Sequence, residues 1–230
     1  MEEYFPGVEA EAFFQSIGKA IEALEEGRKE REEKERAGEE EQKGKEEKEA
    51  VGDKKAAGEE RDYLYILPGR FEENLSITLD HLSIEGAGRD LVTIFGKLGG
   101  YEILSDGIKR GTFRTQTVFV HGKDISLRNL TIENGAGQGK KVGQAIALYA
   151  DGDRLFFEGV NLLGHQDTLF CGPLPEKEVE PGGFRGPLEH APRINGRQLY
   201  RDCQIEGTVD FIFGSATAFF EECQIISVDP

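Results

Sequence analysis

The chain has 230 residues, of which 37% are hydrophobic and 31% are charged, as expected for one domain with a moderate core. Its formal net charge of −16 argues against nucleic-acid binding by general electrostatic attraction, because phosphate binding needs clustered Lys and Arg. No run of about eighteen apolar residues occurs, so we expect no membrane span. Thirty glycines beside many Val, Ile and Phe residues indicate tight turns between short strands.

The first sixty residues divide into two segments of different character. Residues Glu11 to Leu24 carry apolar side chains at helical spacing, which predicts a short amphipathic helix that caps a larger body, with this unit spanning 1–24. Residues 25–61 contain almost nothing apolar, so we predict a charged, disordered insertion with no structural core. Lys–Glu pairs four residues apart favour a transient helix there, but Gly38 and Gly44 oppose it. A binding role for this insertion is the less favoured alternative.

Residues 62–230 read as short strands separated by turns, and they contain a weak repeat. Its form is apolar, two variable, apolar, one variable, apolar, and its copies begin at Leu79, Leu127, Phe157, Tyr200 and Phe220. Such a repeat is typical of a solenoid whose coils stack their apolar residues into one core. We therefore predict an all-β fold, a right-handed parallel β-helix. A β-sandwich is the structural alternative, but it needs a regular hairpin series that is missing here.

Cys203 and Cys223 occupy the same place in successive copies of this repeat. Stacked strands would place their α-carbons about 4.8 Å apart, which is within disulfide range. A disulfide and a pair of buried free cysteines are therefore both open. Cys171 has no evident mate.

Four polar side chains stand among apolar residues at spacings close to multiples of one coil. Gln144 and Gln166 are twenty-two residues apart, and Asp167 and Asp210 are forty-three apart. A Pro- and Gly-rich segment at 171–197 accounts for the longer interval as an inserted loop. A solenoid with these coil lengths would bring all four side chains to one face.

Two carboxylates and two amides on one face can carry out acyl transfer. One Asp can attack a carbonyl carbon while the other donates and later accepts a proton, and the amides can stabilise the oxyanion. The same pair of acids could instead serve a glycosidase, and spacing alone does not separate the two chemistries.

Three ordered segments carry a family resemblance. They are Gly-Gln-Ala-Ile-Ala-Leu at 143–148, Gln-Asp-Thr-Leu-Phe at 166–170 and Gly-Thr-Val-Asp-Phe-Ile-Phe-Gly at 207–214. Together they resemble the signature segments of the pectin methylesterase (pectinesterase) family, and Leu67 to Asn74 resembles the family's early Pro-Gly-x-Tyr-x-Glu segment. The resemblance covers Tyr63 to Ile226.

The resemblance implies a role for each of the four polar residues. Asp210 would be the nucleophile and Asp167 the general acid/base, with Gln166 stabilising the oxyanion and Gln144 assisting it. The implied reaction hydrolyses methyl esters of galacturonate units in pectin to pectate and methanol. It implies no cofactor and no metal.

The resemblance also implies contacts with a pectin or methylated oligogalacturonate substrate. Thr112 and Gln144 would contact it, and Phe170 and Phe213 would line the sugar cleft, although core packing is an equal alternative for either ring. His165 matches no catalytic position and is expected to be a solvent or turn residue. The acidic net charge weakly favours a methyl-esterified, less anionic polymer over pectate. We expect a monomer.

Two departures from the family pattern limit these implications. The family carries a later Leu-Gly-Arg-Pro-Trp segment whose Arg orients the nucleophile, and this sequence ends at Pro230 without it. We therefore expect an incomplete β-helix, and a non-catalytic oligogalacturonate-binding protein is the first alternative. A pectate lyase is less favoured, because no acidic calcium cluster is evident. The acidic N-terminus shows no secretory signal, so we expect either a cytoplasmic protein or a sequence that lacks its true start, because the family is mostly secreted.

Overall fold

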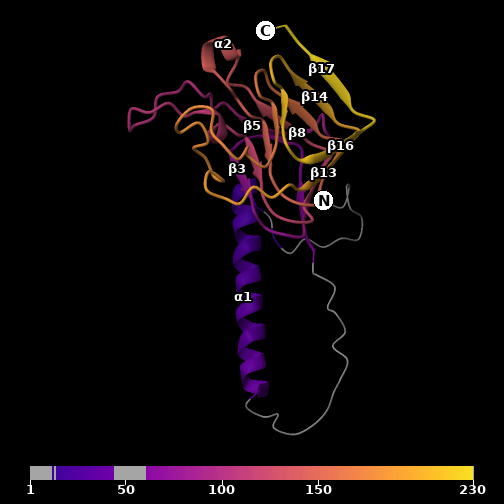
Figure 1. The fold of residues 1–230 in the computed structure, drawn as a ribbon. Coiled ribbons are helices and arrows are strands. Elements are labelled where there is room, and N and C mark those ends of the chain that lie inside the picture. Colours follow the sequence, from indigo (N-terminus) through magenta and orange to yellow (C-terminus); the bar gives the residue numbers. More distant parts are fainter. Residues whose placement is uncertain (1–11, 13, 44–60, 230) are drawn as a thin grey trace.

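The computed structural model describes residue 12, residues 14–43 and residues 61–229. Helix α1 (Ile17–Lys43) projects from one end of a stack of short strands, as Figure 1 shows, and it packs against the first coil. Two single turns of helix, η1 (Thr112–Arg114) and α2 (Gly139–Val142), interrupt the strands. None of these helices is long and apolar enough to cross a membrane.

The strands form three sheets in which each coil contributes one strand per sheet, except that the last described coil has strands in sheets A and B alone. Sheet A has the order β1 (Asp62–Ile66), β4 (Leu82–Gly86), β7 (Ser126–Arg128), β10 (Leu155–Glu158), β13 (Arg197–Arg201) and β16 (Thr217–Glu221). Sheet B has β2 (Gly69–Glu72), β5 (Val92–Gly96), β8 (Thr131–Asn134), β11 (Asn161–Leu163), β14 (Gln204–Gly207) and β17 (Gln224–Ser227). Sheet C has β3 (Leu75–Ile77), β6 (Val118–Val120), β9 (Leu148–Ala150), β12 (Leu169–Cys171) and β15 (Ile212–Gly214). Neighbouring strands pair in parallel throughout, which confirms the predicted parallel β-helix.

Apolar residues at equivalent positions of successive coils fill the interior. On sheet A, Leu127 aligns with Phe157, Phe157 with Tyr200, and Tyr200 with Phe220. The rings of the last three residues stack at 4.8 and 4.7 Å between centroids, with interplanar angles of 10°. The buried Tyr200 hydroxyl donates to Gln198 Oε1 at 2.7 Å, so its polar atom is satisfied inside the core. Burial of each such ring contributes about 1.5–3 kcal/mol, and the ladder fixes the coil register.

The first copy of the sequence repeat was out of phase. The sequence placed Leu79 where later copies have Leu127, but in the structure Ile84 is the residue aligned with Leu127. Later coils turn from sheet A to sheet B through one left-handed residue, such as Asn129 at φ 53° or Asp202 at φ 49°. The corresponding turn of the first coil is longer, since β4 ends at Gly86 and β5 begins only at Val92. The longer turn explains the misaligned pattern.

Helix α1 begins later than predicted because a side chain from the first coil caps it. The Ser16 hydroxyl and the Gly18 N–H each donate to Glu73 Oε2 at 2.9 Å, and the Ile17 N–H donates to Glu73 Oε1 at 3.2 Å. A carboxylate at this position satisfies N–H groups that have no partner within the helix and suits the positive end of the helix dipole. Glu73 belongs to the segment that resembled the family's early motif, so this motif residue has a structural task here.

The prediction of a disordered insertion that starts at residue 25 was wrong for residues 25–43, which continue α1. Arg28 and Arg31 form ion pairs with Asp62 of β1, which anchors the middle of the helix to the β-helix. Beyond that anchor the sequence is rich in Glu, Lys and Arg, which propagate a helix once it is nucleated, even without an apolar face. Residues 44–60 of the predicted insertion lie outside the described residues.

The cysteine alternatives are decided by the structure. Cys203 and Cys223 are free thiols, and Cys171 is also free. Cys203 Sγ donates to Phe157 O at 3.5 Å and Cys223 Sγ donates to Tyr200 O at 3.4 Å, so each thiol points at the backbone of the preceding coil. The disulfide is therefore absent, and the two residues act as small core side chains.

Candidate active site

Asp167 and Asp210 lie in equivalent turns of adjacent coils, immediately before β12 and β15. Leu169 pairs with Ile212, so each Asp stands two residues before the same rung of sheet C. The Asp167 N–H donates to Val209 O at 3.1 Å, which ties the two turns together. Both residues have left-handed backbones, at φ 66° and φ 46°. Such a conformation is uncommon for residues other than Gly, and the shared turn places both residues at the same edge of sheet C.

The two carboxylates differ in environment. Asp167 is 6% exposed, whereas Asp210 is exposed. The pKa of Asp167 is raised to about 7. Burial is the largest cause, the negative charge of Asp210 adds to the rise, and a hydrogen bond with the Gln166 side chain opposes it. The effect of Asp210 shows that the acids are close enough to interact. One acid therefore keeps its proton near neutral pH, and the other is an accessible carboxylate. General-acid and nucleophilic catalysis require this division of roles.

Gln144 and Gln166 stand on adjacent coils beside these acids. The N–H of Ala145, the residue after Gln144, donates to the Gln166 carbonyl oxygen at 3.0 Å. This backbone hydrogen bond joins the Gln144 and Gln166 segments across adjacent coils. Two glycines let neighbouring loops approach them. A Cβ at Gly139, the first residue of α2, would lie 2.9 Å from Gln166 Cβ, and a Cβ at Gly100 would lie 3.1 Å from Gln144 Oε1. Both amides are therefore held by close backbone contact.

Thr112 follows a loop that is bonded to the Gln144 segment. The Gly100 N–H donates to Gln144 O at 2.8 Å, and the Gly111 N–H donates to Gly100 O at 3.0 Å. Thr112 begins η1 directly after Gly111 and is partly exposed. This connection places Thr112 on the loop that borders the amides, where the resemblance implied a substrate contact.

Phe170 does not line an open cleft, contrary to one of the two alternatives that the sequence left. It is 1% exposed and packs edge-on against Tyr149, with ring centroids 4.8 Å apart, and against Phe113 at 5.0 Å. Phe213 aligns with Phe170 on the next coil, 4.8 Å away, and remains partly exposed. Phe170 therefore belongs to a core, because the inserted loop at 172–196 folds back over sheet C and covers it with Phe184 and Leu188.

Two buried polar groups on and directly after β9 were not identified from the sequence. Asp151, directly after β9, is 8% exposed, and burial raises its pKa, opposed by nearby His121 and Arg193. The Tyr149 hydroxyl is buried without a hydrogen-bond partner among the described residues, and burial raises its pKa above the usual range. An Asp directly after a buried strand was the only sequence signal for this group.

His165 lies in the turn before Asp167, as predicted, but its environment is more enclosed than a solvent histidine would have. Its carbonyl accepts the Thr208 N–H at 2.7 Å, which joins the two site turns. Its Nδ1 atom is buried and has no hydrogen-bond partner in the described part of the chain. Within that part, no group of three His, Cys, Asp or Glu side chains is arranged to hold a metal ion.

The fold and these groups define a parallel β-helix protein with an acid pair and two amides suited to acyl transfer. The Pectinesterase profile matches residues 37–173 and 193–230. The chain belongs to the pectinesterase family.

Individual relatives agree with this assignment. A pectinesterase/pectinesterase inhibitor of Prunus persica is 37% identical over 169 residues, which cover 73% of this chain and 27% of the relative. The structure of pectin methylesterase PemA from Erwinia chrysanthemi superposes with a TM-score of 0.58 at 33% identity, covering 75% of this chain and 48% of PemA. A pectin methylesterase in complex with a hexasaccharide gives the same identity, coverage and TM-score. The chain thus spans about a quarter of the plant relative and about half of the solved structures.

Proposed function

We propose that this chain hydrolyses methyl esters of galacturonate units in pectin, releasing methanol and leaving a carboxylate. The observation that carries the proposal is the pair formed by Asp167 and Asp210, in which one acid is buried with a pKa of about 7 and the other is exposed. Membership of the pectinesterase family and a related structure with a bound hexasaccharide support a saccharide substrate.

The reaction follows from these two environments. The Asp210 carboxylate attacks the ester carbonyl carbon, and the amide groups of Gln144 and Gln166 stabilise the negative oxygen that forms. Asp167 gives its proton to the departing methoxide, so methanol leaves and an acyl anhydride with Asp210 remains. Asp167, now ionised, takes a proton from water, and the resulting hydroxide attacks the anhydride. Asp210 leaves as a carboxylate, and the substrate departs with a free carboxyl group.

The proposal is tested by methanol release from highly methylated pectin and from methylated oligogalacturonates. We expect release by the unmodified chain, loss of release in Asp210→Ala and Asp167→Ala, and reduced release in Gln166→Ala. Asp90→Asn is a matched control, because Asp90 is an exposed carboxylate in the turn between sheets A and B.

Other products would contradict the proposal. New reducing ends would indicate a glycosidase, and an unsaturated product would indicate a lyase. Methanol release that survives in Asp210→Ala, or saccharide binding by the unmodified chain without any methanol release, would refute the assigned chemistry.

A further inference from the structure

A trough lies on the outer face of sheet A, away from the acid pair on sheet C. One row of residues crosses four strands of this sheet, with Tyr63 opposite Ser83, Ser83 opposite Ser126, and Ser126 opposite Phe156. The two small serines leave a cavity of about 290 Å³ between the two aromatic residues. Parallel strands are about 4.8 Å apart, so the aromatic positions are roughly 14 Å apart across the trough.

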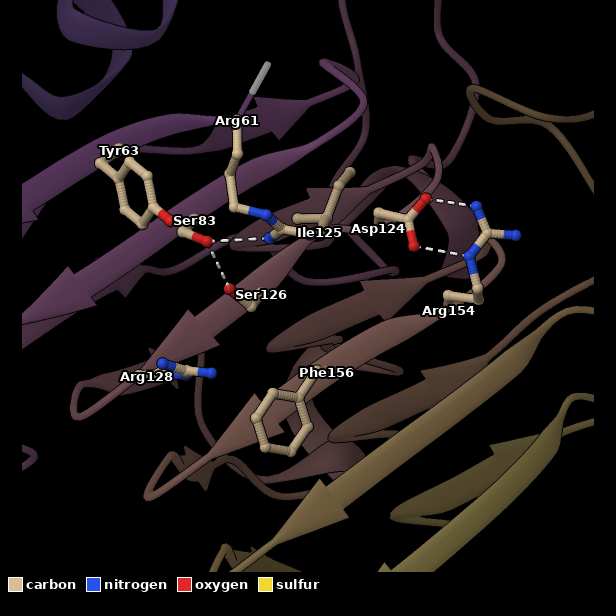
Figure 2. Close-up of a pocket in the computed structure, with 9 residues that line it drawn as sticks. All are labelled: Arg61, Tyr63, Ser83, Asp124, Ile125, Ser126, Arg128, Arg154 and Phe156. Atoms are coloured by element: carbon tan, nitrogen blue, oxygen red, sulfur yellow. Dashed lines mark hydrogen bonds and ion pairs between the residues drawn. The ribbon is translucent and has the colours of Figure 1, made fainter. Parts of the chain in front are cut away.

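Arginine side chains border the trough on both sides of this row. Arg61 Nη1 donates to Ser83 Oγ at 2.9 Å, and Ser83 Oγ accepts from Ser126 at 3.0 Å, as Figure 2 shows. Asp124 holds Arg154 in a two-point ion pair at the other end of the same view. Three arginines and one aspartate line the cavity. Arg154 also pairs with Asp153 and Arg128 with Glu158, so the local positive charge comes chiefly from Arg61, which is bonded to a neutral serine.

Arg128 retains an unused donor at the edge of this trough. Its guanidinium lies 5.2 Å from the centroid of the Phe156 ring, and its Nε atom is 3.4 Å from Glu158 Oε2. The geometry of that ion pair makes no hydrogen bond, and Nε is buried without any acceptor among the described residues. Because Nε itself is buried, a ligand in the trough would meet the outer nitrogens of this guanidinium, whose side chain is 42% exposed.

These groups match one class of ligand. Guanidinium groups bind carboxylates through paired hydrogen bonds, and aromatic rings pack against the C–H faces of sugar rings. A simple inorganic anion would use the arginines but not the two aromatic walls. Repulsion by the acidic surface is screened beyond about 8–10 Å at physiological salt, so guanidinium groups in the trough can still bind an acidic sugar at close range.

We propose that this trough binds free uronate units of an acidic oligosaccharide, at a site separate from the acid pair. The identity of the ligand rests on the proposed function, because ester hydrolysis converts neutral units into such carboxylates. The trough would hold a de-esterified stretch of the polymer while sheet C faces another stretch.

The test uses trigalacturonate as the probe, with binding to the whole chain measured by isothermal titration calorimetry at two salt concentrations. We expect Arg61→Gln and Tyr63→Ala each to weaken binding by roughly five- to tenfold. Tyr63 is 75% exposed, so its truncation should leave the fold intact even if a change at Arg61 does not. Arg36→Gln on exposed α1 is the control and should bind like the unmodified chain. Higher salt and full methyl esterification of the probe should both weaken binding.

Methanol release separates this inference from the proposed function. Arg61→Gln and Tyr63→Ala should release methanol from a short methylated oligomer at the unmodified rate, and Asp210→Ala should keep the trough-dependent part of trigalacturonate binding. Trigalacturonate binding that depends on Arg61, without methanol release by the unmodified chain, would contradict the proposed function but not this inference. Equal trigalacturonate binding by the unmodified chain and both trough variants would overturn the inference.

Discussion

Replacement of the buried acid by its neutral isostere should stabilise the protein at neutral and alkaline pH. Asp167 is 6% exposed and its pKa is raised to about 7, first by burial and then by Asp210. A carboxyl whose pKa is higher in the folded state than in the unfolded chain binds protons more tightly when folded. The free energy of unfolding therefore falls as the pH rises from about 4 to about 7.

The size of this effect follows from the pKa difference. An unfolded Asp has a pKa of about 3.9, and each pH unit of difference corresponds to about 1.4 kcal/mol. With a folded pKa of about 7, the ionised Asp167 costs up to about 4 kcal/mol at pH 8. Asp167→Asn removes this cost, so its advantage should reach a few kcal/mol at pH 8 and vanish near pH 4.

The assay is urea unfolding of both proteins at a series of pH values between 4 and 8. Their difference removes the contribution of all titrating groups that do not interact with Asp167. Asp90→Asn changes an exposed carboxylate and should shift the free energy of unfolding by less than about 0.5 kcal/mol at every pH. An Asp167→Asn advantage that is the same at pH 4 and pH 8, or a variant less stable at pH 8, would refute this reasoning.

Three further predictions concern the helix cap, the thiols and the amide support. Glu73→Ala leaves the first N–H groups of α1 without their acceptor and should lower the free energy of unfolding by about 1–2 kcal/mol; an unchanged urea midpoint would count against the cap. Reductant should not change the melting temperature, and thiol labelling of the unfolded, unreduced chain should modify both Cys203 and Cys223; protection of the pair would reveal a disulfide. Gly139→Ala should displace Gln166 and lower methanol release up to about a hundredfold, while full activity would show that Gln166 tolerates the shift.

The constellation of acids and amides could be predicted because coil length controls which residues share a face. Once the repeat gave parallel stacking, the intervals between Gln144, Gln166 and Asp210 placed them in the segments that precede successive strands of sheet C. The inserted loop at 172–196 was visible as a Pro- and Gly-rich segment, so it did not disturb this alignment. The resemblance of the segments at 143–148, 166–170 and 207–214 to pectinesterase motifs then implied roles for the acids, whose spacing alone did not separate an esterase from a glycosidase.

Other features depend on contacts that no local pattern contains. The charged part of α1 lacks an apolar stripe, but the ion pairs of Arg28 and Arg31 with Asp62 hold it in place. The sequence did not decide whether Phe170 lines a cleft or packs in a core, because its burial depends on a loop that folds back over it. Equivalent positions in the repeat brought Cys203 and Cys223 into register, but their side chains point at carbonyl groups instead of at each other.

The central claim is that two acids from different coils share one site, and the titration of Asp167 tests it most directly. Carboxyl carbon NMR should give Asp167 a pKa of about 7 in the unmodified chain. In Asp210→Asn the pKa should fall but stay above its ordinary value of about 3.9, because burial, the larger cause, remains. An Asp167 pKa near 4, or one that does not move when Asp210 is neutralised, would show that the two carboxylates do not form a pair.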